Sequence, residues 1–158
     1  AWAEEHGARV HAFPPAKDFT DTELALRIAA ELMPRALVVL TGAFGGRFDH
    51  LMSAASVAAH AALPCILADE CEALFFLHGD ESLTVTCDSP PQAISLLPFT
   101  EECTGITTNG LRWELSHAQI HTHSSTTISN VLAEGNTEHR FSVALGSGIL
   151  GVYLCHKE

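Results

Sequence analysis

The chain has little positive charge and no long hydrophobic run. Its 158 residues include 8 lysines and arginines against 19 acidic residues, which gives a net charge of −11. Because nucleic-acid binding needs concentrated positive charge, this balance argues against a nucleic-acid partner. No apolar stretch approaches the roughly 20 residues of a membrane-spanning helix. The amino terminus has no basic-then-apolar signal pattern, so we expect a cytoplasmic protein with no membrane partner.

Cysteines are few and show no pairing pattern. The five are Cys65, Cys71, Cys87, Cys103 and Cys155, and no two have Cys-x-x-Cys spacing. An odd number without such a pair argues against a disulfide framework and against a zinc site, so we expect reduced thiols. Apolar residues make up 47% of the chain, which is enough for a buried core in one domain or in two small ones.

The first half alternates short apolar runs with helical patterns. Strands are expected at residues 10–13, 36–40 and 65–68, and helices at residues 22–33 and 49–62. Such alternation predicts a parallel sheet covered by helices. After residue 78 the helical pattern gives way to short β-rich runs, which predict an antiparallel sandwich or barrel. Strands are expected there at residues 82–87, 93–97, 112–115, 119–123, 128–132, 140–145 and 149–154. The predicted fold class is α/β followed by all-β.

A glycine-rich turn follows the apolar run at residues 36–40. Residues 41–50 read TGAFGGRFDH and precede an alanine-rich helical segment. The glycines allow a sharp bend and a close approach to a ligand, and the helix start offers unpaired N–H groups to an anion. Arg47 can bind phosphate oxygens, and Asp49 can hold Mg²⁺ or orient a donor. The turn therefore predicts a phosphate site, although similar turns also join strands to helices without any ligand.

A second acidic cluster, KDFTDTE at residues 17–23, precedes the first expected helix. Thr20 or Asp21 is suited to cap that helix, and Glu23 is favoured by the helix dipole. Capping does not account for Asp18. Since Asp18 and Asp21 follow the strand expected at residues 10–13, both acidic motifs are predicted near the carboxyl ends of strands, where open α/β sheets bind ligands.

Motifs along nearly the whole chain resemble those of one enzyme family. DFTDTELAL at residues 18–26 and GAFGGRFDH at residues 42–50 resemble thiamine pyrophosphokinases, which move a diphosphate from ATP to the hydroxyethyl oxygen of thiamine. The second half agrees with ISLLP at residues 94–98, GITTNGLRWEL at residues 105–115 and TISN at residues 127–130. The resemblance implies a thiamine diphosphokinase that uses ATP and Mg²⁺ and forms thiamine diphosphate and AMP.

The resemblance also implies residues for phosphate chemistry. Asp21, Asp49 and Arg47 are the candidate catalytic residues, and Asp18, Asp21 and Asp49 are the candidate Mg²⁺ ligands. Diphosphate transfer needs charge neutralisation at the phosphates and an attacking oxygen held in line, which carboxylates with Mg²⁺ and a cationic donor can supply. Arg47 is expected to contact a phosphate or to orient Asp49.

Further residues are expected to bind the two substrates. Gly45 and Gly46 shape the ATP phosphate site, together with Asp18. Thiamine carries a cationic thiazolium ring, so Trp113 is the expected platform for it, with Ser129 and Asn130 bonding the pyrimidine. A place for Trp113 in the core of the β half is an equally good interpretation.

The chain departs from the family at its beginning. The family begins with an apolar strand, an acidic glycine turn and a Gly-Asp-Phe-Asp-Ser-like motif, and these are not seen here. We therefore expect an amino-terminally truncated, incomplete Rossmann-like layer for ATP and Mg²⁺ at residues 1–78, and a thiamine-binding antiparallel β domain at residues 79–158. The family's vitamin pocket lies between two subunits, which implies a homodimer. The alternatives are a non-catalytic thiamine-binding and dimerisation remnant, or another Mg²⁺-dependent phosphotransferase.

Three histidines, His117, His121 and His123, lie an even number of positions apart, in and just before an expected strand. Side chains two residues apart share a strand face, so these imidazoles could bind a metal such as Zn²⁺ or Ni²⁺. No acidic or cysteine ligand is fixed beside them, and an exposed polar strand face is the interpretation that we favour.

Overall fold

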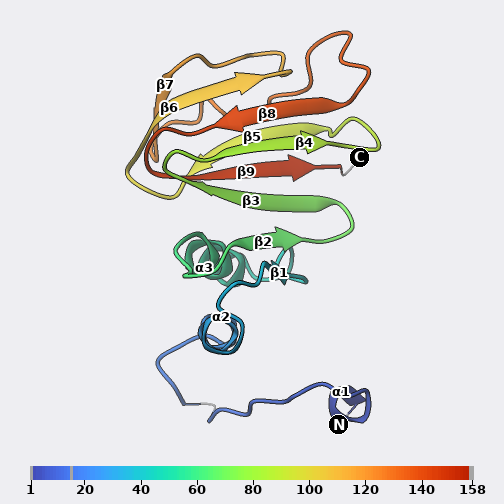
Figure 1. The fold of residues 1–158 in the computed structure, drawn as a ribbon, viewed down its shortest axis with the longest axis vertical. Coiled ribbons are helices and arrows are strands. Elements are labelled where there is room, and N and C mark those ends of the chain that lie inside the picture. The colour runs from blue at the N-terminus through green and yellow to red at the C-terminus, as the bar shows by residue number, and fades with distance from the viewer. Residues whose placement is uncertain (1, 15, 157–158) are drawn as a thin grey trace.

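The computed structural model describes residues 2–14 and 16–156, which form two sheets and three helices. Strands β1, β2, β3, β9 and β5 make one sheet in that order, and β4, β8, β6 and β7 make the other. The elements are α1 (Trp2–Glu5), α2 (Asp21–Leu32), β1 (Val38–Leu40), α3 (Phe48–Ala59), β2 (Cys65–Ala68), β3 (Glu72–His78), β4 (Ser82–Thr86), β5 (Ala93–Pro98), β6 (Glu102–Asn109), β7 (Ala118–His121), β8 (Arg140–Ala144) and β9 (Ile149–Cys155). In Figure 1, α1 lies far from the sheets, with α2 between them.

The five-stranded sheet is mixed. Only β1 and β2 pair in parallel, and the other neighbours are antiparallel. The prediction of a parallel sheet therefore holds for one pair of strands. The strand expected at residues 10–13 is wrong: Val10 and Phe13 are exposed and lie in irregular backbone. An isolated apolar run does not form a strand without a partner edge to pair with.

Helix α2 starts with a side-chain cap and ends before a proline. Thr20 Oγ1 accepts a hydrogen bond from the Glu23 N–H at 3.2 Å, which satisfies one of the free donors at the helix start. Arg27 forms an ion pair with Glu23 at 2.7 Å, one helical turn away. Pro34 stands two residues after Leu32 and cannot continue the helix, which ends within one residue of its expected limit at residue 33.

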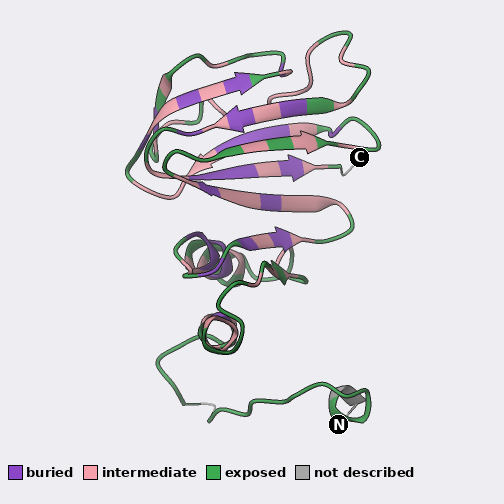
Figure 2. Ribbon diagram, in the orientation of Figure 1, coloured by how far each residue is buried: buried purple, intermediate pink, exposed green. Residues whose placement is uncertain are grey.

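Helix α3 packs on the five-stranded sheet through small side chains. Ala54, Ala55, Ala58 and Ala59 are buried. Alanines let the helix backbone approach the sheet closely, and Leu26, Leu67 and Leu74 belong to the same apolar cluster. Figure 2 shows burial on the inner side of α3 and along the strands, whereas the segment before α2 is exposed. The turn at residues 41–47 therefore leads into a helix that is fixed against the sheet.

A second apolar cluster joins the two sheets. Ile94 and Val152 come from the five-stranded sheet, while Ile106, Phe141 and Val143 come from the four-stranded sheet, and all five are fully buried. No helix occurs between residues 82 and 154, so the prediction of an all-β second half is confirmed. Strands β5 and β9 nevertheless join the sheet that begins with β1. The division of domains at residue 78 stays a prediction.

Several strand predictions in the second half differ from the structure. Residues 112–115 form no strand, and residues 128–132 form only isolated bridges, at Asn130 with Ile94 and at Leu132 with Leu111. The prediction missed β3 and β6 because both begin with a glutamate and β6 is interrupted by Gly105, at a break in its register with β7. Such interruptions hide the alternation that identifies a strand.

No helix in the described part of the chain has the length and apolar character needed to cross a membrane.

Candidate functional site

The glycine turn joins β1 to α3 and is open on its outer side. Gly45 has a φ of 120° and Gly46 a φ of 67°, and a Cβ at either position would meet no atom within 4 Å. A φ of 120° is accessible almost only to glycine, so this sequence is needed for this backbone path. The exposed peptide groups leave room for a ligand to approach the main chain.

A cavity of about 390 Å³ lies between this turn and the start of α2. Its walls are Thr20, Thr22, Leu40, Thr41, Gly42, Ala43, Gly45, Arg47, His50, Ser53 and Ala54. The amino-terminal ends of α2 and α3 therefore border one space. Helix starts, hydroxyl groups and a guanidinium are all donors to an oxyanion, so the cavity suits phosphate groups.

Arg47 and Asp49 bind each other at the rim of this cavity. Arg47 Nε donates to Asp49 Oδ1 at 3.1 Å, and Arg47 Nη2 donates to Asp49 Oδ2. The hydrogen bond from Arg47, opposed by a smaller desolvation effect, holds the pKa of Asp49 below its ordinary value; the same bond raises the pKa of Arg47. Asp49 is 63% exposed and Arg47 70% exposed, so a ligand can reach both. The structure thus brings Arg47 and Asp49 into direct contact at the turn, and their catalytic roles stay a prediction.

None of the three predicted carboxylates, Asp18, Asp21 and Asp49, is in the cavity lining. Asp21 is 90% exposed and pairs with Lys17 at 2.6 Å, and Asp18 lies in an exposed bend before α2. Asp21 starts α2 and Asp49 lies in the first turn of α3, so the residues next to both line the same cavity. Within residues 2–14 and 16–156, no group of three or more His, Cys, Asp or Glu side chains is placed to hold a metal. The structure thus does not gather Asp18, Asp21 and Asp49 into one cluster.

Trp113 lies in a bend between β6 and β7, and its prediction as a strand residue is wrong. Its side chain is 58% exposed, and the Arg112 guanidinium lies 5.1 Å from its ring centroid. The neighbouring Ile128 is 46% exposed, and both line a shallow cavity of about 80 Å³. Small-molecule pockets usually measure about 300 to 1,000 Å³, so this hollow can support one ring but cannot enclose a two-ring ligand.

Asn130 holds the Trp113 segment in place. Its Oδ1 accepts from the Trp113 N–H at 3.2 Å, and its Nδ2 donates to the Trp113 carbonyl at 2.8 Å. Ser129 has a φ of 60°, and its N–H donates to Ser95 Oγ at 3.0 Å. Sequence reasoning missed this positioning role because nothing local connects residues 17 positions apart.

The three predicted histidines lie in different local structures. His121 ends β7 and its ring stacks on His123 with centroids 5.2 Å apart, while His117 precedes the strand with a φ of 49°. The three histidines therefore do not share one strand face.

All five cysteines are free thiols, and burial raises the pKa of Cys65 and Cys87.

Two family models match the chain, one in each half. The model described as the thiamin pyrophosphokinase catalytic domain matches residues 1–66, and the model described as the thiamin pyrophosphokinase vitamin B1 binding domain matches residues 79–149. The two matches have the same order as the two groups of motifs. The chain belongs to the thiamine pyrophosphokinase family. The family resemblance seen in the sequence is confirmed.

Solved structures of the family have the same architecture. Thiamine pyrophosphokinase from Bacillus subtilis matches with a TM-score of 0.76 and 26% identity over 90% of this chain and 66% of that chain. The enzyme from Geobacillus thermodenitrificans matches with a TM-score of 0.73 and 27% identity over 92% of this chain and 66% of that chain. A family protein from Enterococcus faecalis, at 22% identity and a TM-score of 0.76 over 92% of this chain and 68% of that chain, shows the shared fold.

This chain spans about two thirds of the length of those family members. The mixed sheet with its two longer helices and the separate antiparallel sheet fit the family fold. The prediction of an α/β part followed by an antiparallel β part is confirmed at this level.

Proposed function

We propose that this chain is a thiamine diphosphokinase, which transfers the diphosphate of ATP to thiamine and forms thiamine diphosphate and AMP. The observation that carries the proposal is the pair of family matches, which place a catalytic domain before a vitamin B1 binding domain in one chain. The cavity at the glycine turn suits phosphates, and the exposed ring of Trp113 suits a cationic heterocycle. The donor and acceptor sites would thus lie in different halves of the chain, the first in a Rossmann-like layer and the second in a β-sandwich or barrel.

On the donor side, the chain's own groups would bind and orient phosphates. The peptide N–H groups around Gly45 and Gly46 and the start of α3 would donate to phosphate oxygens. Arg47 would turn its free donors to the diphosphate while Asp49 keeps its guanidinium in position. In the transfer, the thiamine hydroxyl oxygen bonds to the β-phosphorus, the bond from that phosphorus to the α-phosphate oxygen breaks, and the hydroxyl proton leaves.

Members of this family generally use Mg²⁺ with ATP, and the carboxylates near the cavity are oxygen donors of the kind that this ion prefers. Mg²⁺ prefers oxygen ligands and usually combines one or two carboxylates with substrate phosphates and water. Asp49 is exposed and its pKa is lowered, so its carboxylate is ionised at neutral pH, and Asp21 heads the neighbouring helix. The bound ion would neutralise charge on the phosphates. Asp18, Asp21 and Asp49 would be its carboxylate ligands.

On the acceptor side, Trp113 would stack on thiamine and attract its thiazolium charge. Asn130 keeps the Trp113 segment fixed, and Ser129 follows the exposed Ile128. The hollow beside Trp113 is too small to enclose the vitamin, so a second wall is needed. We therefore propose a cytoplasmic homodimer in which the glycine-turn cavity of one subunit faces the Trp113 surface of the other.

The function is tested by incubating the purified chain with thiamine and Mg²⁺-ATP and measuring thiamine diphosphate and AMP by mass spectrometry. Equal amounts of the two products are expected, and omission of Mg²⁺ should abolish both. Thiamine binding without product would support the second candidate, a non-catalytic thiamine-binding remnant. That candidate is favoured by the exposed position of Asp21, which is paired with Lys17 outside the cavity. A folded chain that neither binds nor converts thiamine would contradict both.

Replacing Trp113 with alanine should weaken thiamine binding about tenfold, the loss expected for cation–π and stacking contacts of about 1 to 2 kcal/mol. Isothermal titration calorimetry is the suitable measurement because it does not depend on tryptophan fluorescence. Trp113→Phe keeps an aromatic face, so its affinity for thiamine should lie between the affinities of the unsubstituted protein and of the alanine variant. Unchanged affinity in the alanine variant would exclude Trp113 from the vitamin site.

A further inference from the structure

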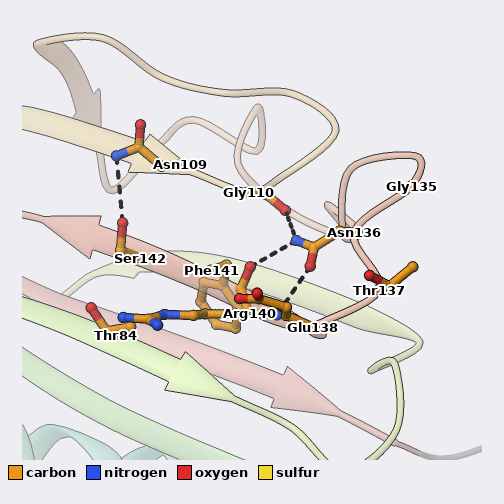
Figure 3. A pocket seen from close by; sticks show the side chains of 10 residues that line it. All are labelled: Thr84, Asn109, Gly110, Gly135, Asn136, Thr137, Glu138, Arg140, Phe141 and Ser142. Atoms are coloured by element: carbon orange, nitrogen blue, oxygen red, sulfur yellow. Dashed lines mark hydrogen bonds between the residues drawn. The ribbon is translucent and has the colours of Figure 1, made fainter.

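A third cavity, of about 460 Å³, lies on the outer face of the four-stranded sheet (Figure 3). It is lined by Thr84, Asn109, Gly110, Gly135, Asn136, Thr137, Glu138, Arg140, Phe141 and Ser142. None of these residues lines the glycine-turn cavity or the hollow beside Trp113. The proposed kinase function uses no part of it. Its volume falls in the usual range for a small-molecule site.

The floor of this cavity is a row of polar side chains from three adjacent strands. Thr84 on β4 pairs with Ser142 on β8, and Ser142 pairs with Asn109 on β6. Directly opposite residues point to the same face, so their side chains gather there. Asn109 Nδ2 donates to Ser142 Oγ at 3.4 Å. The row offers hydroxyl and amide groups to a ligand that carries several oxygens.

The wall is a loop locked by one asparagine. Asn136 Nδ2 donates to the Gly110 carbonyl at 2.9 Å and to the Arg140 carbonyl at 2.7 Å, and its Oδ1 accepts from the Arg140 N–H at 3.2 Å. A Cβ on Gly110 would lie only 2.5 Å from the Arg140 carbonyl oxygen, so the two segments are in direct contact. A wall held by three hydrogen bonds is preorganised and would lose little freedom when a ligand binds.

Arg140 and Glu138 line the cavity with opposite charges and do not form an ion pair with each other. Among the described residues, neither the Arg140 guanidinium nor the Glu138 carboxylate forms an ion pair or a side-chain hydrogen bond. Figure 3 shows Arg140 extended along the floor toward Thr84. A guanidinium fits the oxygens of a phosphate, whereas a carboxylate fits the hydroxyls of a sugar. A bare phosphate would satisfy Arg140 but would be repelled by Glu138.

We propose that this cavity binds a phosphorylated pentose, free or as part of a nucleotide, with its phosphate on Arg140 and its hydroxyls on Glu138, Asn109 and Ser142. Such a ligand matches both charges and the polar floor at once. A neutral sugar would leave Arg140 unmatched, and an inorganic anion would leave the carboxylate unmatched.

Calorimetric titration with ribose 5-phosphate, ribose and inorganic phosphate tests this proposal. Ribose 5-phosphate should bind at least about tenfold more tightly than either fragment, the scale of one added charge-assisted contact. Arg140→Gln should lower its affinity to that of ribose, and Glu138→Gln should weaken ribose 5-phosphate but not phosphate. Arg47→Gln is the matched control for the glycine-turn cavity, which also suits phosphates: an affinity for ribose 5-phosphate that this variant lowers belongs to that cavity and contradicts the proposal. Titrated into the Arg47→Gln protein, in which the phosphate site at the glycine turn is weakened, adenosine monophosphate should bind more tightly than ribose 5-phosphate if the ligand is a nucleotide, and no more tightly if it is a free sugar phosphate.

Three results would overturn the proposal: no saturable binding at millimolar ribose 5-phosphate, equal affinity for inorganic phosphate, or unchanged affinity in a folded Arg140→Gln protein. Thermal unfolding of each variant identifies loss of folding. If Arg140→Gln proves unstable, Thr84→Val and Ser142→Ala remove floor contacts and must weaken binding instead. The test is independent of kinase activity, so its outcome and that of the proposed function can be told apart.

Discussion

Replacing Asp49 with asparagine should lower kcat for thiamine diphosphate formation at least about a hundredfold, the scale seen when one electrostatic group that acts on the transition state is lost. The substitution removes the carboxylate that receives both donors of Arg47. It also removes a charged oxygen ligand from the rim where we place Mg²⁺. The measurement is the steady-state rate of the intact gene product with saturating Mg²⁺-ATP and thiamine.

The control for this substitution is Asp80→Asn. Asp80 is also exposed and lies in a turn with a φ of 62°, a conformation that asparagine tolerates. It should retain the full rate, and neither variant should change the thermal midpoint appreciably because Asp49 is mostly exposed. If the Asp49 variant turned over at nearly the unsubstituted rate, Asp49 would have no place in the mechanism.

Replacing Gly148 with alanine should reduce the free energy of unfolding by about 3 kcal/mol or more, because backbone strain and overpacking add at this position. Gly148 has a φ of 103°, and its Cβ would lie 2.7 Å from the Glu102 carbonyl oxygen, 2.8 Å from Thr100 Oγ1 and 2.9 Å from Cys103 Sγ. Thr100 Oγ1 also accepts from the Ile149 N–H at 3.1 Å, at the start of β9. The added methyl group would displace backbone that joins the two sheets.

Equilibrium urea unfolding measures this loss, and Gly135→Ala provides the comparison. Gly135 has a φ of 80° but meets no atom within 4 Å of its Cβ position, so it should lose only about 1 kcal/mol from left-handed strain. The difference between the losses in free energy of unfolding of the two variants measures the contribution of the steric clash at Gly148. Equal losses would show that the surroundings of Gly148 relax and that backbone conformation alone sets the cost.

Local signals predicted much of the helical part and the glycine turn. Thr20 caps α2, and its hydrogen bond to Glu23 is decided by residues three positions apart. Gly45 and Gly46 allow the backbone to form the turn, because they adopt positive φ angles that are rare for other residues. The strands at Cys65–Ala68 and Ser82–Thr86 agree with their predicted ranges within one residue because their apolar or alternating patterns are uninterrupted. In each case the determining interactions lie within a few residues.

The pairing of distant segments could not be predicted in this way. Strand β9 lies between β3 and β5, and this arrangement decides that residues after position 78 continue the sheet that starts at β1. Trp113 was expected in a strand, but Asn130 holds it in an exposed bend through two hydrogen bonds. Asn136 likewise joins the turn at Gly110 to Arg140. The contacts of Asn130 with Trp113 and of Asn136 with Gly110 span 17 and 26 positions and carry no local pattern.

By itself, the sequence determined the caps, the turn, the all-β second half and the motifs that identify the family, because short-range sterics and side-chain chemistry set each of them. Only the tertiary structure decided that β9 continues the sheet of β1, that Asp18, Asp21 and Asp49 all stay outside the cavity lining, and that Asn130 supports Trp113. A side chain's partner depends on which elements the fold brings together, and that choice is made by burial of the whole core, not by its neighbours in the chain.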